Sequence, residues 1–427
     1  MLLPGYKVLL HWRQTWRSLI CVSAMVLLNA CNPINPPSEE PSERPRVAAL
    51  AHHGYIWQRQ WQTTHAQLLA QSQADIQQLR LLALQYHVSA HGPVWFQTDL
   101  PLPLLAQDKR PIWLVVRLDG QLPQLPSTTL VARLTTILQQ WQQAGVTIAA
   151  VEIDYDSARS QLASYQLWLK QLRQQLPSEL PLAITALPDW LQSPDFQALQ
   201  TEVDVLTMQL HSVLSPEQGL FDASLAKHWA TQLAASSTIP FYLALPTYHS
   251  ALIKLPQDDS QPKTRFVVES EVLQLHAGAR QELWVDPRQL AALLNHLEQQ
   301  RWPLLQGIAW FRLPLPTDER NLPYTTLQAL IQQRPLRSDL EISVTGTAPV
   351  LELWASNVGL TPMSLPRVIS LQRQGCLYAE AAAGSKLSST NHGYQLQLDT
   401  AKTIGVGQRV LLAWFHCQQL QLADASV

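Results

Sequence analysis

The sequence predicts an α/β protein, in which a TIM (β/α)8 barrel precedes a small all-β, sandwich-like domain. Short apolar runs alternate with amphipathic stretches between about residues 50 and 335, as parallel strands alternate with helices. Eight such repeats within about 285 residues match this barrel, which typically needs roughly 250. After Pro335, short strands of alternating polarity follow one another without a helical pattern between them.

The apolar runs are the predicted barrel strands, and the Gln-rich amphipathic stretches are the predicted surface helices. An open doubly wound sheet is the alternative, but the Gly-rich first turn typical of that fold is absent from the sequence. The predicted strands are Gly54–Trp57, Leu79–His87, Ile112–Leu118, Thr147–Asp156, Leu182–Leu187, Val205–Leu210, Phe241–Leu245 and Gly307–Leu313. The predicted helices include Thr129–Ala144, Leu162–Leu176, Leu225–Ala235 and Arg288–Arg301.

The segment Ala251–Val285 is longer than a connection from a strand to a helix requires. Its stretches Thr264–Glu269 and Glu271–His276 have β-type composition, so we expect a hairpin inserted after the seventh barrel strand. Such an insertion is either a pocket wall or a lid, or a decoration without function.

Beyond the barrel, the predicted strands belong to a small β-sandwich of roughly 90 residues. We expect this module to brace the barrel, although such modules also bind ligands. Its strands are Leu340–Val344, Val350–Trp354, Val368–Gln372, Tyr394–Leu398 and Val410–Cys417.

The first 30 residues have the features of a signal peptide. The apolar segment Leu19–Leu28 is too short to span a bilayer as a helix, and basic residues precede it. The run Leu28-Asn29-Ala30-Cys31 resembles the bacterial lipobox, in which the cysteine is lipidated. The alternative is an ordinary signal peptide with a chance cysteine. The basic residues are Lys7, Arg13 and Arg17.

The residues after Cys31 predict an exported, tethered protein. Asn32 favours sorting to the periplasmic side of the outer membrane over the inner membrane, and the Pro-, Ser- and Glu-rich stretch that follows cannot bury a core. Because the periplasm permits disulfides, Cys376 and Cys417 are either a disulfide or two buried free thiols. The predicted segments are a signal peptide at 1–30, a disordered tether at 31–48, the barrel at 49–335 and the sandwich at 338–427.

Composition excludes several function classes. The formal net charge of −2 and the lack of a basic stripe argue against a nucleic-acid partner. The sequence has no G-x-G-x-x-G or Walker loop, no zinc-binding H-E-x-x-H and no G-x-S-x-G, so we expect no nucleotide cofactor, no metal and no serine triad. The 15 tryptophans favour a sugar-like ligand, since flat rings stack on sugars. We expect a monomer.

The most informative run is Glu152-Ile153-Asp154-Tyr155-Asp156 in the fourth predicted strand. Side chains alternate faces along a strand, so the three acids share one face. Like charges on one face of an apolar strand are costly unless they are solvated, paired or used. We expect Glu152 to be buried and structural, whereas Asp154 and Asp156 open into a polar pocket. Either aspartate is alternatively a structural partner of Arg117 or Arg312.

Barrel enzymes place their chemistry at the carboxyl ends of the strands, so the residues at those ends are the candidate site. Carboxylates, amides and aromatic rings converging on one mouth are typical of a sugar site, and glycoside hydrolysis uses two carboxyl groups of different pKa. The candidate catalytic residues are Asp154, Asp156 and Asp189. The candidate ligand-binding residues are Trp57, Arg117, Asp119, Gln209, His211, Tyr248, Trp310 and Arg312.

Four motifs together resemble the bacterial domain-of-unknown-function 3142 family, over about residues 50–335. The resemblance implies the barrel fold and export as a lipoprotein. It does not imply an activity. The motifs are Trp57-Gln58-Arg59-Gln60-Trp61, Glu152-Ile153-Asp154-Tyr155-Asp156, Ile184-Thr185-Ala186-Leu187-Pro188-Asp189-Trp190-Leu191 and Trp310-Phe311-Arg312-Leu313-Pro314.

The fourth strand also resembles the D-x-x-D-x-D-x-E signature of family 18 glycoside hydrolases. Asp154 and Asp156 match the second and third acids, but Val151 stands at the first acid and Ala158 at the catalytic glutamate. The general acid of that family is therefore missing. Two hypotheses follow: a glycosidase-like enzyme of the cell envelope, with Asp189 or Asp119 supplying the acid, or a lipoprotein that binds a glycan or scaffolds a complex without catalysis.

Overall fold

The computed structural model describes residues 50–120, 122, 124–211, 219–254, 266–269, 279–300, 302–318, 320–382, 384–398 and 403–423. The predicted signal peptide, Cys31 and the whole of the predicted tether lie outside these residues, as does the stretch Glu271–His276. Within the described chain, none of the helices is long and apolar enough to cross a membrane.

Eight parallel strands close into a barrel, which confirms the predicted fold. They follow one another in the order β1-β12-β8-β7-β6-β5-β4-β2, and β2 pairs back onto β1 to complete the ring. Each strand overlaps one of the predicted apolar runs. Their bounds are β1 Ala51–Ile56, β2 Gln78–Ser89, β4 Ile112–Leu118, β5 Ile148–Tyr155, β6 Leu182–Ala186, β7 Val205–Gln209, β8 Phe241–Pro246 and β12 Leu305–Phe311.

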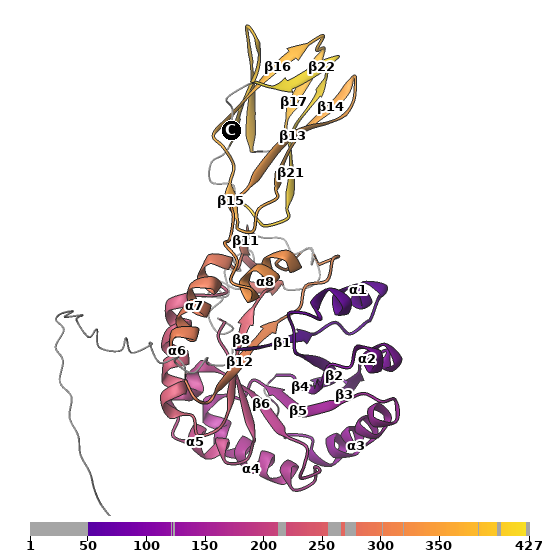
Figure 1. The fold of residues 1–427 in the computed structure, drawn as a ribbon, viewed down its shortest axis with the longest axis vertical. Helices are drawn as coiled ribbons and strands as arrows, with labels where there is room; N and C mark the ends of the chain where they lie inside the picture. Colours follow the sequence, from indigo (N-terminus) through magenta and orange to yellow (C-terminus); the bar gives the residue numbers. More distant parts are fainter. Residues whose placement is uncertain are drawn as a thin grey trace, which may run out of the picture. The chain divides into compact units, whose positions relative to one another are not determined.

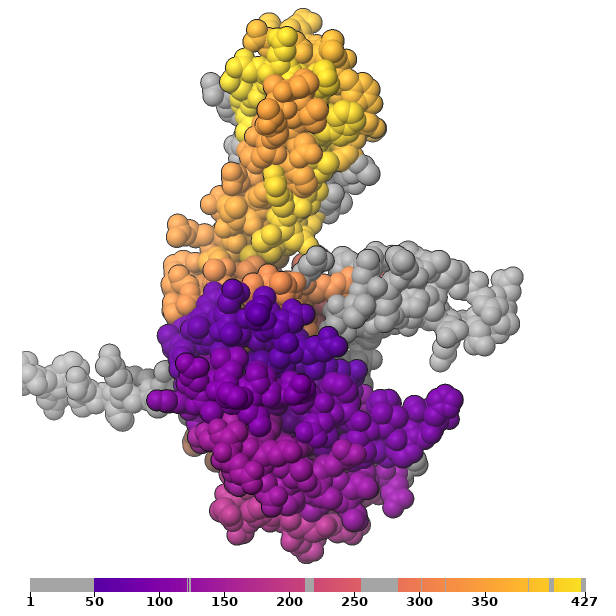
Figure 2. All heavy atoms as spheres, turned by 90° about the vertical axis from the view of Figure 1, so that its right-hand side faces the viewer, coloured from indigo at the N-terminus to yellow at the C-terminus, as the bar shows by residue number. Residues whose placement is uncertain are grey.

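Helices surround the strands on the outside of the ring (Figure 1). The four predicted helices are present as α3, α4, α6 and α7, with ends within a few residues of the expected positions. Figure 2 shows the face of the barrel that the first part of the described chain covers, in indigo to magenta. The helices are α1 Thr63–Ser72, α2 Leu102–Asp108, α3 Ser127–Gln143, α4 Leu162–Arg173, α5 Asp195–Gln200, α6 Ala223–Ser236, α7 Pro287–Gln300 and α8 Tyr324–Ile331.

Two additions interrupt the simple repeat. Strand β3 (Gly92–Gln97) pairs antiparallel with the carboxyl end of β2, and the sequence analysis did not predict this hairpin. In the insertion, β9 (Ser250–Lys254) lies between β10 (Phe266–Glu269) and β11 (Ala279–Leu283) and pairs antiparallel with both. The strand expected at residues 264–269 is therefore β10, and its described partner is β9.

After α8 every described regular element is a strand, and the predicted β-sandwich is confirmed. Two four-stranded sheets, β13-β14-β21-β17 and β18-β19-β16-β22, share one buried apolar cluster, separate from that of the barrel. Cys376 and Cys417 form a disulfide with Cα atoms 3.9 Å apart. The strands are β13 Leu340–Thr347, β14 Val350–Asn357, β15 Met363–Ser364, β16 Val368–Gln374, β17 Tyr378–Ala381, β18 Ser385–Thr390, β19 Gly393–Leu398, β20 Thr403–Ile404, β21 Arg409–His416 and β22 Gln419–Leu422.

The alternation of β5 determines what fills the barrel. Ile153 and Tyr155 pack outward into the large apolar cluster that the helices cover, and Tyr155 contacts Tyr165 of α4 with ring centroids 5.2 Å apart. Glu152 and Asp154 therefore face inward, as the spacing of the acids predicts. The bottom of the interior is an apolar layer that includes Trp113 of β4, and the charged side chains of the interior lie above this layer.

A fully buried ion pair occupies the middle of the barrel. Arg80 Nη1 lies 2.5 Å from Glu152 Oε1, and both side chains are completely inaccessible to solvent. Tyr55 Oη donates to the Glu152 carboxylate at 3.0 Å, and Arg80 Nη1 donates to Thr207 Oγ1 at 2.6 Å. The guanidinium also lies 3.9 Å from the ring centroid of Trp113. Every partner comes from a different strand, so the contacts of Arg80 and Glu152 connect strands around the barrel.

Removing one member of this pair should destabilise the barrel strongly. We expect Arg80→Met to lower the free energy of unfolding by about 3–5 kcal/mol, because Glu152 would stay buried without its cation. The double variant Arg80→Met/Glu152→Leu should recover part of the loss, because it removes the buried charge. Urea unfolding measures both effects. Arg334→Met, at an exposed arginine, is the control and should change stability by less than about 0.5 kcal/mol. A double variant no more stable than the single would contradict the expectation.

Candidate functional site

A cavity of about 990 Å³ opens at the carboxyl ends of the barrel strands. This is the face on which barrel enzymes carry their sites. Side chains at or just beyond the ends of all the barrel strands contribute to its wall. Nine of the sequence-predicted residues line it: Trp57, Arg117, Asp119, Asp154, Asp156, Gln209, His211, Tyr248 and Arg312.

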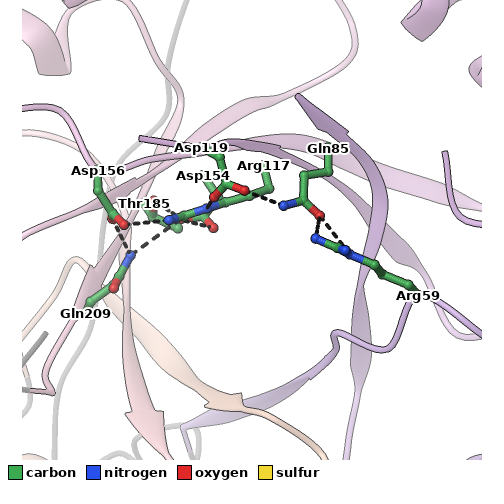
Figure 3. Close-up of polar contacts among 8 residues, drawn as sticks. All are labelled: Arg59, Gln85, Arg117, Asp119, Asp154, Asp156, Thr185 and Gln209. Atoms are coloured by element: carbon green, nitrogen blue, oxygen red, sulfur yellow. Dashed lines mark hydrogen bonds and ion pairs between the residues drawn. The ribbon is translucent and has the colours of Figure 1, made fainter. Parts of the chain in front are cut away.

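Arg117 is the centre of the cavity's polar network (Figure 3). Its Nη1 lies 2.9 Å from Asp154 Oδ2, its Nη2 lies 2.7 Å from Asp156 Oδ2, and its Nε lies 3.1 Å from Asp119 Oδ1. Burial alone would lower the pKa of Arg117, but the carboxylates of Asp154 and Asp156 outweigh burial and raise it. One permanent cation therefore holds three carboxyl groups.

Strand register explains why these groups meet. Gln85 of β2 stands opposite Arg117 of β4, and Arg117 stands opposite Asp154 of β5. Directly opposed residues on neighbouring strands have side chains on the same face, within reach of each other. The network is thus built on the barrel strands and on Asp119 and Asp156, the residues directly after two of them.

Asp154 is the most enclosed of the three acids, with 6% of its side chain exposed. Its Oδ1 accepts hydrogen bonds from Thr185 Oγ1 at 2.7 Å and from Gln209 Nε2 at 3.5 Å. Burial raises the pKa of Asp154 to about 6, and the nearby Asp156 adds to the rise, although Arg117 and Thr185 lower it. Asp154 therefore changes its charge at a higher pH than an ordinary aspartate.

Asp156 and Asp119 are the more accessible acids. Their side chains are 34% and 36% exposed, so both can contact a ligand. Gln209 Nε2 lies 3.4 Å from Asp156 Oδ1 and so connects Asp156 to Asp154. Their exposure places carboxylate oxygens, which accept hydrogen bonds from hydroxyl groups, at the surface of the cavity.

A second chain of contacts leads from Asp119 to the rim. Gln85 Nε2 donates to Asp119 Oδ2 at 2.5 Å, and Gln85 Oε1 accepts from Arg59 Nη2 at 2.6 Å. The sequence analysis did not select Gln85, and the register of β2 shifts between Leu82 and Leu84. Such a bulge reverses which residues face inward, and simple alternation does not reveal it.

Aromatic rings form another part of the wall. Trp57 lies against Phe311, with ring centroids 4.9 Å apart, and both line the cavity. Tyr248 Oη lies 3.4 Å from His211 Nδ1. Burial lowers the pKa of His211 to about 4, although Asp156 opposes the shift, so the imidazole is neutral at pH 7. The cavity thus combines apolar ring faces with hydrogen-bonding groups.

Arg312 and Asp318 make a further ion pair in the wall. Arg312 Nη2 lies 3.5 Å from Asp318 Oδ1, and both side chains are largely buried. Asp318 also accepts a hydrogen bond from the backbone N–H of Leu315 at 3.0 Å, which fixes the loop after β12. The sequence analysis did not select Asp318, since it lies beyond the strand in a loop with no regular period.

Two predicted site residues lie elsewhere, which corrects the sequence-based list. Trp310 is fully buried outside the barrel ring, where its Nε1 donates to His52 Nδ1 at 3.1 Å, and its neighbour Phe311 takes the inward place. Asp189 is in the 3-10 turn Pro188–Gln192 after β6 and does not line the cavity. Burial raises the pKa of Asp189, against the opposing effect of Arg159.

The arrangement suits recognition of a polar, hydroxyl-rich molecule. Among the described lining residues, the four acids Asp119, Asp154, Asp156 and Asp318 face the three arginines Arg59, Arg117 and Arg312. The described part of the chain contains no group of three or more His, Cys, Asp or Glu side chains placed to hold a metal ion.

Residues 108–316 match the family described as "Domain of unknown function (DUF3142)". The expected resemblance to this family is confirmed over that range. No curated protein matches the sequence.

Several solved structures are similar to this chain at low identity. The spore cortex-lytic enzyme SleL of Bacillus cereus has 14% identity and a TM-score of 0.45, over 63% of this chain and 72% of that one. A chitinase of Chromobacterium violaceum has 13% identity and a TM-score of 0.45, over 67% and 98%. A glycoside hydrolase family 18 N-acetylglucosaminidase of Paenibacillus barengoltzii has 12% identity and a TM-score of 0.41, over 66% and 99%.

The raised pKa of Asp154 should make stability depend on pH. Its folded-state pKa is about 6, against an ordinary value of 3.8, so the folded protein holds this proton more tightly than the unfolded chain. The stabilising contribution is complete below about pH 4 and is lost as the pH rises through 6. Relative to Asp154→Asn, the parent should lose roughly 1–3 kcal/mol of stability between pH 4 and pH 7.

Urea unfolding at a series of pH values measures this difference. Asp339→Asn, at an exposed aspartate of the C-terminal region, is the matched control and should follow the parent at every pH. Parallel stability curves for the parent and Asp154→Asn would show that Arg117 keeps Asp154 ionised throughout the range.

Proposed function

We propose that the cavity at the mouth of the barrel binds a carbohydrate. One observation carries this proposal: the aromatic wall of Trp57 and Phe311 and the acids held by Arg117 line the same cavity of about 990 Å³. Ligand pockets typically measure roughly 300–1,000 Å³, so the space suits an oligosaccharide.

The chemistry of the lining fits sugars better than other small molecules. A sugar ring presents apolar C–H groups on its faces, which pack on aromatic side chains, and hydroxyl groups around its edge. Asp119 and Asp156 accept hydrogen bonds from such hydroxyls, and they are partly exposed. Because the described lining holds more acids than arginines, it favours a neutral ligand over an anionic one.

Hydrolysis of a glycosidic bond is the second candidate, and the raised pKa of Asp154 favours it. The raised pKa of Asp154 lets it act as an acid beside the second carboxyl group of Asp156, and glycosidases use such a pair of carboxyl groups. The acid would protonate the leaving oxygen while the carboxylate stabilises the positive charge or activates water. Against it, Asp154 already receives hydrogen bonds from three side chains, and Ala158 stands where family 18 enzymes carry their glutamate.

We also propose that the protein is a lipid-anchored protein of the cell envelope, on the periplasmic side of the outer membrane. The lipobox-like Leu28-Asn29-Ala30-Cys31 supports an anchor at Cys31. The disulfide between Cys376 and Cys417 supports export, because disulfides persist mainly in oxidising compartments. In that compartment the available carbohydrates are envelope glycans and their fragments.

Binding and turnover of glycans distinguish the two candidate functions. We expect isothermal titration with cello-, chito- and muropeptide-type oligosaccharides to find at least one ligand of millimolar affinity or better. Trp57→Ala should weaken that binding about tenfold, since it removes one stacking face. Asp156→Asn should abolish any turnover while the melting temperature stays within a few degrees, because it changes charge and not shape.

Trp229→Ala, at a half-buried tryptophan of α6, and Asp339→Asn are the matched controls and should leave binding unchanged. Binding without turnover by the parent would exclude hydrolysis of that ligand. If no oligosaccharide binds, or if Trp57→Ala binds as well as the parent, the carbohydrate proposal is wrong.

The anchor is tested by Cys31→Ser. We expect this variant to leave the membrane fraction or to accumulate with its signal peptide uncleaved, because the acylated thiol is lost. Cell fractionation and mass spectrometry of the intact protein measure both outcomes. Cys376→Ser is a suitable control, since it removes a cysteine that is not in the predicted lipobox. Unchanged fractionation and mass for Cys31→Ser would contradict the anchor.

A further inference from the structure

The β-sandwich carries exposed aromatic rings on one open sheet face. In the sheet β13-β14-β21-β17, the side chains of Leu353 and Phe415 are buried in the sandwich core. Trp414 is next to Phe415 in the strand, so it points to the opposite, outer face, where 38% of its surface is exposed. Tyr378 of β17 lies beside it, 50% exposed, with ring centroids 5.0 Å apart.

Two carboxylates flank Trp414 on this face. In the strand register, Glu352 of β14 and Glu380 of β17 both stand directly opposite Trp414, one on either side. Opposed residues share a face, so the two acids and the tryptophan form a row across three strands. The Trp414 ring thus lies between two hydrogen-bond acceptors on an exposed surface.

Hydrogen bonds hold the row in place. Tyr378 Oη donates to Glu380 Oε2 at 3.0 Å, and Trp354 Nε1 donates to Glu352 Oε2 at 2.9 Å. Arg409 lies over the Trp354 ring, 4.1 Å from its centroid, so Trp414 and Tyr378 present the more open rings. Each carboxylate is oriented by a neighbouring side chain and keeps further lone pairs for an external donor.

We propose that this face is a second carbohydrate-binding site, which takes the flat side of a neutral polysaccharide chain. The rings of Trp414 and Tyr378 would pack on the C–H faces of successive sugars, and Glu352 and Glu380 would accept hydrogen bonds from their hydroxyls. Solvent-exposed aromatic groups in one cluster mark an interaction site. The proposal is independent of the barrel cavity, because it uses none of the cavity's residues.

The charge of this sheet face favours neutral polysaccharides over anionic ones. Two carboxylates flank Trp414, whereas Arg409 is the cation that contacts Trp354 at one end of the row. The face therefore carries net negative charge near Trp414. An anionic polymer such as alginate would meet like charges there, which is unfavourable for association. A neutral polymer donates its hydroxyls to the same carboxylates.

Affinity electrophoresis of the full-length protein tests the proposal. The probes are gels that contain hydroxyethyl cellulose, glycol chitin, soluble starch or alginate. We expect at least one uncharged polymer to retard the parent, and alginate not to retard it. Trp414→Ala and Tyr378→Ala should each lower the association constant about tenfold, because each removes one stacking ring. Glu380→Gln should lower it less, since the amide still accepts hydrogen bonds.

Val368→Ala, at an exposed valine of the other sheet, is the control and should keep the parent's retardation. Trp57→Ala reports separately on any binding of the polymer in the barrel cavity. Thermal unfolding within a few degrees of the parent would establish that Tyr378→Ala remains folded. The proposal is overturned if no uncharged polymer retards the parent, or if both ring variants are retarded as the parent is. Loss of retardation in Trp57→Ala alone would assign the polymer to the cavity instead, and would overturn the second site while supporting the first.

Discussion

The acids of β5 constrain the whole interior of the barrel. The two-residue period of this strand places Glu152, Asp154 and Asp156 in one column, and each of these carboxylates needs a partner because the barrel excludes most water. Two arginines from other strands provide it: Arg80 of β2 pairs with Glu152, and Arg117 of β4 pairs with Asp154 and Asp156. The barrel therefore closes around two layers of paired charge, above a layer that is apolar.

The two layers differ in the balance between arginines and carboxylates. The lower one is balanced, with one arginine against one glutamate, and its remaining hydrogen bonds are satisfied by Tyr55 and Thr207. The upper one sets Arg117 against three aspartates. The unbalanced layer is the one that reaches the cavity, where water or a ligand can donate hydrogen bonds to the aspartates. This difference is the physical reason to place recognition at the upper layer and structural stability at the lower one.

Much of this architecture could be predicted from the sequence, because it depends on local periodicity. The eight strands overlap the predicted runs, and the inward column of β5 follows from its alternation. The errors arise where that alternation is ambiguous or broken. Trp310 and Phe311 are adjacent aromatic residues at the end of β12, so composition could not choose which one faces inward. The bulge in β2 shifts the period, so alternation counted from Arg80 would have placed Gln85 outward.

The choice between binding and hydrolysis depends on Asp154, on whose pKa opposing effects act and burial prevails. Burial and Asp156 favour its neutral form, whereas Arg117 and the hydroxyl of Thr185 favour its anion. For binding alone the anion is sufficient, since it fixes Arg117 and leaves Asp156 to meet the ligand. For hydrolysis, Asp154 or a neighbour must release a proton toward the glycosidic oxygen. A ligand that expels water from the cavity would strengthen the burial effect and so favour the neutral form. The same desolvation also strengthens the attraction to Arg117. Catalysis therefore requires that the ligand weaken this ion pair, whereas recognition requires that the ion pair persist.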